Sequence, residues 1–360
     1  MVVFGPIVRN PMSSVLRYRS ESPHFGLRVP ICFIRKLPKS VVLILSTLFV
    51  VMSANAAENA CSEVELQTFD HSEHLPVELC IPPGSGPFPA VVDLRPRICE
   101  GPVGIPPSWE QSALPAWGYA ILVIDSFAMR GLAPGACDDL NSLTTKQMVG
   151  DAYAGLEFLM RDSRIDHERV ALLGFVNGVA TATVLADTVE ARDAFATTEG
   201  GSFRAFFAFS PYCNLEFTGP PPGLYAPARI FAGEKDDMEP ASRCVDLAKS
   251  LKAGGADLQV TIYPDAQAGF DTIPPDTNYP LADRTALHPG GTTLSTHPQY
   301  SPWTHNFADC TVRLKSVFDL VDPREVAGCQ RRGVHAQGNP DVAEQARKDL
   351  KEQLKALAGE

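Results

Sequence analysis

The stretch that decides the fold of this 360-residue chain is Val170-Ala-Leu-Leu-Gly-Phe-Val-Asn-Gly178. Its first six residues form an unbroken apolar run, which is typical of a strand buried inside a sheet. Residues 177–187 then place apolar side chains at three- and four-residue spacing, which predicts a helix. The stretch therefore predicts a buried strand, a sharp turn and a helix in immediate succession.

The same alternation of strand-like and helix-like segments recurs along the chain. The strand-like apolar runs lie at residues 90–94, 119–125, 170–175, 205–210, 229–233 and 258–263. The helix-like segments lie at residues 108–117, 145–161, 177–187 and 241–253. This alternation predicts an α/β fold, with a mostly parallel central sheet and helices on both faces.

Three later segments complete the structural prediction. Residues 271–306 are rich in Pro, Thr, Gly and His and predict a long surface loop or lid. Residues 309–321 predict a helix. Residues 341–357 predict an amphipathic helix that packs against the domain or, alternatively, docks a partner; its apolar face holds Val342, Ala346, Leu350, Leu354 and Leu357.

The first 56 residues have the pattern of an export signal. They carry seven Lys and Arg residues and one acid, followed by an apolar run at residues 41–52 and then Ala54-Asn-Ala56. The run is shorter than the roughly 20 residues of a membrane span, so it favours a cleaved signal over an uncleaved anchor or a buried strand. We expect a periplasmic or extracellular protein with a signal over residues 1–56, an N-terminal extension over 57–86, one domain over 87–325 and a C-terminal tail over 326–360.

Composition and charge limit the partners. Hydrophobic residues make up 45% of the chain and charged residues 20%, which excludes a wholly disordered chain. Residues 57–360 hold 24 basic and 41 acidic residues, a formal charge of −17. A surface with this much negative charge repels phosphate backbones and anionic lipid. We therefore expect no nucleic-acid partner and no membrane association after signal cleavage. The oligomeric state stays open.

No cofactor and no metal site is predicted. Among the eight scattered histidines, only His71 and His74 have ligand-like spacing, and we interpret them as solvated side chains.

The cysteines predict disulfides. Cys32 falls within the signal, and the eight remaining cysteines form an even set in an exported chain, which favours disulfides over thiols or metal ligands. Eight cysteines allow 105 connectivities. Pairing neighbours along the chain gives Cys61–Cys80, Cys99–Cys137, Cys213–Cys244 and Cys310–Cys329.

Several segments, in order, carry a resemblance to a known family. They are Phe88-Pro-Ala-Val-Val-Asp-Leu94, the run from Trp117 to Phe127 with Arg130-Gly131, the run from Arg164 to Gly174, Gly233-Glu-Lys-Asp-Asp237, and Tyr263-Pro-Asp-Ala266 with Phe270-Asp271. Over roughly residues 87–321 the chain resembles the dienelactone hydrolase family of α/β hydrolases, in a secreted, cysteine-containing branch. The resemblance implies a nucleophile, an acid and a histidine, in that order along the chain.

Most of the implied catalytic positions are substituted. The nucleophile position falls on Val176, which has no hydroxyl or thiol, and the base position falls on Ala268, which cannot take a proton. Pro96 lacks a backbone N–H in the loop that supplies part of the oxyanion hole in relatives. Only the acid position survives, as Asp236 with Asp237 beside it.

These losses predict a catalytically inactive family member, a pseudoenzyme that binds a ligand or a partner. The alternative is an active ester or lactone hydrolase with a displaced nucleophile and base, so the sequence leaves open whether the chain is an enzyme. Candidates for displaced groups are Ser126, Ser210, Cys213, His288, His297 and His305.

The loops near the former site carry three arginines that suggest a ligand. Parallel sheets bind ligands beyond the carboxyl ends of their strands. Arg95, Arg97 and Arg130 lie in such loops of an otherwise acidic protein and predict a small anionic ligand such as a carboxylate; ordinary pairing with Asp or Glu is the alternative.

Overall fold

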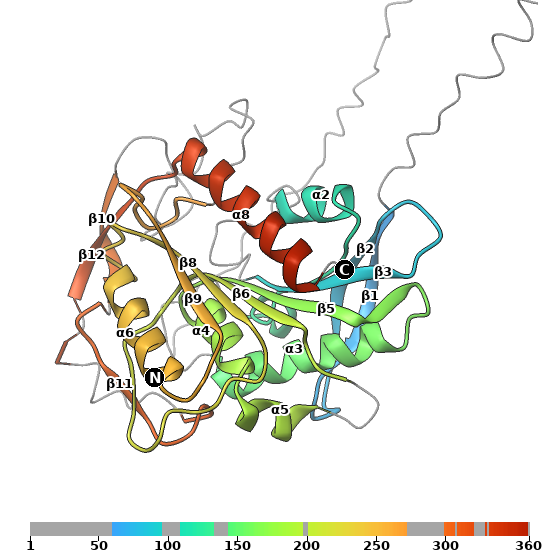
Figure 1. The fold of residues 1–360 in the computed structure, drawn as a ribbon, viewed down its shortest axis with the longest axis horizontal. Helices are drawn as coiled ribbons and strands as arrows, with labels where there is room; N and C mark the ends of the chain where they lie inside the picture. The colour runs from blue at the N-terminus through green and yellow to red at the C-terminus, as the bar shows by residue number, and fades with distance from the viewer. Residues whose placement is uncertain are drawn as a thin grey trace, which may run out of the picture. The chain divides into compact units, whose positions relative to one another are not determined.

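The computed structural model describes residues 60–95, 109–132, 143–196, 201–271, 299–306, 308–319, 328–329 and 331–358. The chain divides into two compact units, residues 1–56 and 57–360, and all described residues lie in the second. The described residues form the coloured ribbon in Figure 1.

An eight-stranded sheet forms the centre of this unit. Its strand order is β1-β2-β4-β3-β5-β6-β8-β9; β1 and β2 are antiparallel to their neighbours, and all the other pairings are parallel. The strands are β1 (Ala60–Gln67), β2 (His74–Ile81), β3 (Phe88–Leu94), β4 (Ala120–Ile124), β5 (Ile165–Val176), β6 (Ala205–Pro211), β8 (Ala228–Gly233) and β9 (Leu258–Tyr263). All six strands predicted from apolar runs are confirmed.

The hairpin of β1 and β2 was not among the predicted strands. It comes from the segment expected as an N-terminal extension, yet it joins the same sheet through β4. Along β2, Leu75, Val77 and Leu79 are buried, while His74 and Pro76 are exposed and Glu78 is half-buried. The two strands form the antiparallel edge of an otherwise parallel sheet.

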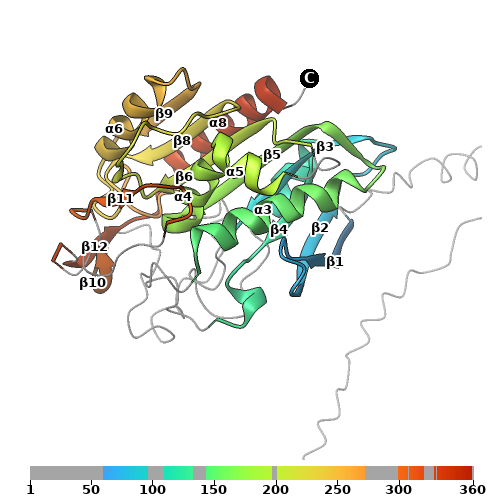
Figure 2. The same cartoon turned by 90° about the horizontal axis from the view of Figure 1, so that it is seen from below.

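Helices cover both faces of the sheet, as predicted. The helices α3 (Thr145–Met160), α4 (Asn177–Ala186) and α6 (Ala241–Lys252) contribute to one hydrophobic cluster, and α2 (Trp109–Ala116) and α8 (Pro340–Ala358) to the other. Figures 1 and 2 show α8 on the face opposite α3 and α4. The predicted packing of the C-terminal helix is confirmed, since Ala346, Leu350 and Leu354 of α8 are buried.

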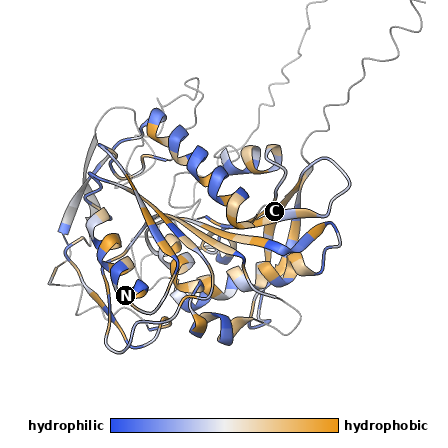
Figure 3. Ribbon diagram, in the orientation of Figure 1, coloured by the Kyte–Doolittle hydropathy of each residue, from blue (hydrophilic) through white to orange (hydrophobic). Residues whose placement is uncertain are grey.

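Successive side chains of a central strand point to opposite faces of the sheet, so they belong alternately to the two clusters. In β5, Val170 and Leu172 belong to the cluster under α3 and α4, whereas Leu173 and Phe175 belong to the cluster under α8. This is the period of two that a strand covered on both faces requires. Figure 3 shows the hydrophobic colouring concentrated on these central strands.

A row of aromatic rings crosses four strands beneath α8. The ring centroids of Phe175 and Phe209 lie 4.9 Å apart, those of Phe209 and Phe231 4.6 Å, and those of Phe231 and Tyr263 6.4 Å, all in stacked orientation. Parallel register explains the row, because Phe175 pairs with Phe209 and Phe209 with Phe231.

The helix predicted over residues 309–321 is wrong. Residues Val312–Leu314 form β11, which pairs in parallel with β7 (Leu215–Phe217). Val312 and Leu314 are buried and Arg313 is exposed, so this short segment follows the period of a strand. Residues 299–306 of the predicted loop form β10 (Gln299–Asn306), which pairs with β12 (Arg331–Ala336), while residues 272–298 lie outside the described residues.

Three of the four predicted disulfides are confirmed: Cys61–Cys80, Cys213–Cys244 and Cys310–Cys329. Cys99 and Cys137 lie outside the described residues. Within the described part of the chain, none of the helices has the length and apolar character needed to traverse a bilayer.

Candidate functional site

The candidate site lies where the parallel strands end. Because β3, β5, β8 and β9 run in the same direction, Arg95, Val176, Asp236 and Ala268 all follow carboxyl ends at one edge of the sheet. In open α/β sheets this edge is where ligands bind. We call it the carboxyl edge.

The nucleophile position ends β5 without an intervening loop. Val176 is the last residue of the strand and Asn177 is the first of α4, so the predicted strand, turn and helix are confirmed. Gly174 is required by packing, because a Cβ there would overlap Thr183 of α4. Gly178 is not, since a Cβ would meet only the terminal methyl of Met148 at 3.9 Å. The frame of a nucleophile turn is present, but valine supplies no nucleophilic atom.

Asp236 is buried and stabilises the turn after β8. Its Oδ1 accepts hydrogen bonds from the backbone N–H groups of Met238 (3.0 Å) and Glu239 (2.8 Å). Its Oδ2 is buried without a hydrogen-bond partner among the described residues. Burial, reinforced by the carboxylates of Asp237 and Asp271, raises the pKa of Asp236 to about 7. The surviving acid therefore acts as a turn cap that holds its proton far more tightly than an exposed aspartate.

Glu239 lies buried next to this cap. Burial, with a further contribution from Asp236, raises the pKa of Glu239 well above its usual value. Its Oε2 has no hydrogen-bond partner among the described residues. The buried carboxyls of Asp236 and Glu239 thus favour the neutral form.

The residue at the base position is buried, and another segment of the chain runs along its loop. Ala268 is buried and packs against Met238. Its carbonyl accepts a hydrogen bond from the backbone N–H of Gln337 (3.1 Å), and the carbonyl of Phe270 accepts one from Asn339 (3.3 Å). The segment between β12 and α8 therefore runs along the loop where relatives carry their histidine.

The strand before that segment, β12, brings a histidine to the carboxyl edge. His335 of β12 places its Nδ1 2.6 Å from Oδ2 of Asp237, and its backbone N–H donates to Oδ1 at 2.9 Å. The side chains are 55% and 38% exposed, respectively. His335 was not predicted from the sequence. The one signal that could have pointed to it is Asp237, a second acid beside Asp236 that needs a partner of its own.

Each predicted ligand-binding arginine that the structure describes has a carboxylate partner. Arg95 is buried in an ion pair with the buried Glu110, and its guanidinium lies 4.5 Å from the ring centroid of Phe175. Arg130 donates to both carboxylate oxygens of Asp151 at 2.7 and 2.8 Å. Arg97 lies outside the described residues. An anionic ligand at these arginines stays a prediction.

The other candidates for a displaced nucleophile or base are three histidines, two serines and Cys213, and the structure describes only some of them. Cys213 is consumed in its disulfide. Ser126 and Ser210 are buried with hydroxyls that have no hydrogen-bond partner among the described residues, and Ser210 has a φ of 47° at the end of β6. His305 lies in β10, and His288 and His297 lie outside the described residues.

One group of potential metal ligands occurs among the described residues, and it does not suit a metal. Cys61, Glu78 and Cys80 lie close together, but the two sulfurs are joined in a disulfide and are not available as thiolate ligands.

Comparison with known proteins agrees with the geometry. Residues 116–287 match the dienelactone hydrolase family, a range that includes Val176, Asp236 and Ala268. No curated protein matches the chain.

Solved structures similar to this chain include a dienelactone hydrolase, an esterase and a peptidase. A protein described as a dienelactone hydrolase from Klebsiella pneumoniae is 18% identical, with 59% of this chain and 90% of that chain covered and a TM-score of 0.45. Thermogutta terrifontis esterase 2, phosphoramylated by tabun, is 15% identical, with 61% and 88% covered and a TM-score of 0.46. An acylaminoacyl peptidase of Pyrococcus horikoshii is 14% identical, with 63% of this chain but only 39% of that chain covered and a TM-score of 0.46.

The fold rests on the strand order, the antiparallel second strand and the strand-to-helix turn at Val176, rather than on these distant structures. These features show that the chain has the α/β-hydrolase fold, and residues 116–287 match the dienelactone hydrolase family.

Proposed function

We propose that this chain is an exported member of the family that is inactive in the acyl-enzyme reaction and acts by binding a ligand or a partner. One observation carries the proposal: the nucleophile and base positions hold Val176 and Ala268 within an otherwise intact strand order. A hydrolase of this fold needs a nucleophile at the first position and a proton acceptor at the second.

The environment of the remaining acid supports the same proposal. In a catalytic triad the acid is ionised and orients a histidine. Asp236 instead caps a turn, and burial raises its pKa to about 7. Its role here is structural.

Two features support export. The first 56 residues have the pattern of a signal, and three disulfides are formed in the described part of the chain. Disulfides persist in the periplasm and outside the cell, where thiols are oxidised.

The test is hydrolysis of short-chain p-nitrophenyl esters by the purified chain, together with labelling by a serine-reactive fluorophosphonate. We expect neither turnover nor labelling. The Val176→Ser plus Ala268→His double variant is the positive control, because it restores both atoms to the same frame. Labelling of the double variant at residue 176 alone would support the proposal, and turnover by the parent above background, surviving further purification, would contradict it.

A second candidate function is ester or lactone hydrolysis with a nucleophile and base at other positions. The pair of Asp237 and His335 favours this candidate. With Nδ1 of His335 held at 2.6 Å by the carboxylate, its Nε2 is oriented as a general base, as in a triad. Such a base would take a proton from water or a hydroxyl and return it to the leaving alcohol.

This candidate predicts turnover that the pair controls. His335→Gln should abolish it, and Asp237→Asn should lower it by about 10²-fold or more. His167→Gln, which changes an exposed histidine near the start of β5, is the matched control. Equal turnover in all three variants would exclude the displaced base.

A further inference from the structure

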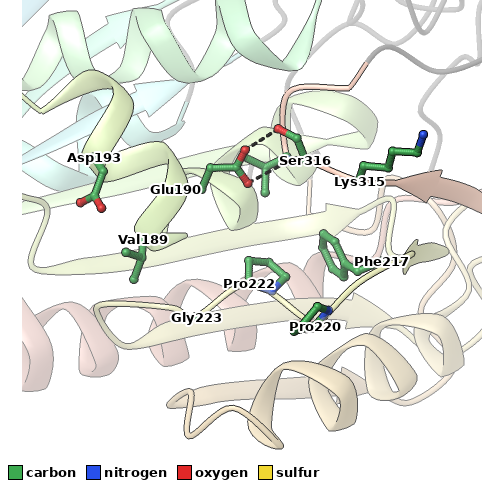
Figure 4. Close-up of a pocket in the computed structure, with 10 residues that line it drawn as sticks. Val189, Glu190, Asp193, Phe217, Pro220, Pro222, Gly223, Lys315 and Ser316 are labelled. Atoms are coloured by element: carbon green, nitrogen blue, oxygen red, sulfur yellow. Dashed lines mark hydrogen bonds between the residues drawn. The ribbon is translucent and has the colours of Figure 1, made fainter.

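A cavity of about 350 Å³ lies away from the carboxyl edge. It is formed by the start of α5 (Val189–Phe195), the loop after β7 and the residues that follow β11. None of its lining residues belongs to the loops after β3, β5, β8 or β9. Figure 4 shows Glu190 and Ser316 on one side of the cavity and Phe217, Pro220 and Pro222 on the other.

Glu190 is held in place by groups that do not neutralise it. One carboxylate oxygen accepts a hydrogen bond from the Ser316 hydroxyl, and the other accepts one from the backbone N–H of Val317 at 3.3 Å. No Lys or Arg pairs with Glu190 among the described residues. The carboxylate is therefore fixed in direction, and its charge is available to a bound cation.

The side of the cavity opposite Glu190 is suited to contact the alkyl groups of an organic cation. Phe217 offers an aromatic ring, whose face attracts cations, and Pro220 and Pro222 supply apolar surface on a stiff loop. A carboxylate facing an aromatic ring is the combination that recognises alkylammonium groups, since the ring and the alkyl groups contact each other while the charges attract.

The other charged residues around the cavity do not oppose the binding of a cation. Asp193 is paired with its neighbour Arg192, whose Nη2 lies 2.9 Å from its carboxylate. In Figure 4 the Lys315 side chain extends away from Glu190. The acidic surface, with a formal charge of −17 over residues 57–360, raises the local concentration of cations rather than anions.

We propose that this cavity binds a small organic cation of the alkylammonium class, with Glu190 contacting the charge and Phe217 the alkyl groups. The inference rests on the ligand-binding role proposed above and gives that role a site and a ligand class.

The test compares choline with 3,3-dimethyl-1-butanol, its neutral isostere, by calorimetric titration of the full chain. We expect choline to bind at least about fivefold more tightly than the alcohol. Glu190→Gln keeps one acceptor oxygen for the N–H of Val317, and its amide N–H can donate to the Ser316 hydroxyl; because the variant removes the charge, it should abolish that preference. Phe217→Leu should weaken choline binding by about two- to fivefold.

Asp193→Asn is the matched control, because it removes a charge from the same rim that Arg192 already compensates; it should leave choline binding within about twofold. Equal affinity for choline and the alcohol, or an undiminished preference in Glu190→Gln with a native unfolding temperature, would overturn the cation site. Fluorophosphonate labelling would instead contradict the proposed loss of acyl-enzyme chemistry, so the two failures can be told apart.

Discussion

The carboxylate of Asp237 holds both the ring and the backbone of His335, although 98 residues separate the two. One oxygen lies 2.6 Å from Nδ1 and the other accepts the backbone N–H at 2.9 Å. The contact therefore ties the turn after β8 to β12, the strand that precedes the segment covering Ala268.

This pair should contribute little to stability, because both side chains are substantially exposed. A double-mutant cycle of Asp237→Asn and His335→Gln, measured by urea unfolding, should give a coupling energy of about 0.2–1 kcal/mol. A coupling above about 2 kcal/mol would mean that the pair is shielded from water in solution.

Burial of Asp236 should make stability fall as the pH rises. Its pKa is raised from 3.8 to about 7, so below pH 3.8 the carboxyl is protonated in both states and costs nothing. Between these values the unfolded carboxyl ionises while the folded one stays neutral, and the free energy of unfolding decreases; above about pH 7 the loss is complete.

Asp236→Asn removes this titration. Between pH 4.5 and 7.5 in urea unfolding, the parent should therefore lose stability relative to the variant, by about 3 kcal/mol. Asp246→Asn, at an exposed position, should keep the slope of the parent. Parallel pH profiles for the parent and Asp236→Asn would contradict the raised pKa.

Breaking the buried pair of Arg95 and Glu110 should be costly. Both side chains are at most 4% exposed, so Glu110→Gln removes the carboxylate charge that faces the buried guanidinium and should destabilise the fold by about 3–5 kcal/mol. Glu157→Gln, which breaks the exposed pair with Arg161, should cost at most about 0.5 kcal/mol. Similar losses in the two variants by urea unfolding would show that Arg95 finds another partner.

Removing a disulfide should lower the free energy of unfolding by an amount that increases with the length of the loop that the disulfide closes. The Cys213→Ala plus Cys244→Ala variant opens a separation of 31 residues and should lose about 3–4 kcal/mol, against about 3 kcal/mol for Cys61→Ala plus Cys80→Ala with a separation of 19. Urea unfolding measures both. Free thiols in the native parent, detected by alkylation and mass spectrometry, would contradict the pairing.

The two glycines of the strand-to-helix turn should respond differently to alanine. Gly174→Ala forces a methyl group against Thr183 and should cost about 1–3 kcal/mol, because β5 or α4 must shift. Gly178→Ala has open space and should be neutral or slightly stabilising within α4. Thermal unfolding of both variants checks this, and equal stability would mean that α4 moves freely against the sheet.

Sequence reasoning was most successful where structure is set by local patterns. The six central strands are apolar runs, and their helices carry apolar side chains at helical spacing, so each could be predicted without knowledge of its neighbours. The helix predicted over residues 309–321 was wrong because β11 has only three residues, too few to distinguish a period of two from a period of 3.6. The hairpin of β1 and β2 was missed for a different reason, because about half of its residues face solvent and neither strand contains an unbroken apolar run.

By itself, the sequence determined the fold class and the three disulfide pairings that the structure describes, because these depend on residue identity and on neighbours along the chain. That the nucleophile and base positions fall on Val176 and Ala268 is likewise a prediction from residue identity. Only the tertiary structure decided that Asp236 is a buried cap, that Arg95 and Arg130 already have carboxylate partners, that His335 meets Asp237, and that Glu190 faces Phe217 across a cavity. These properties depend on which side chains meet across long separations and on how much water remains around them, and both are set when the sheet and helices pack.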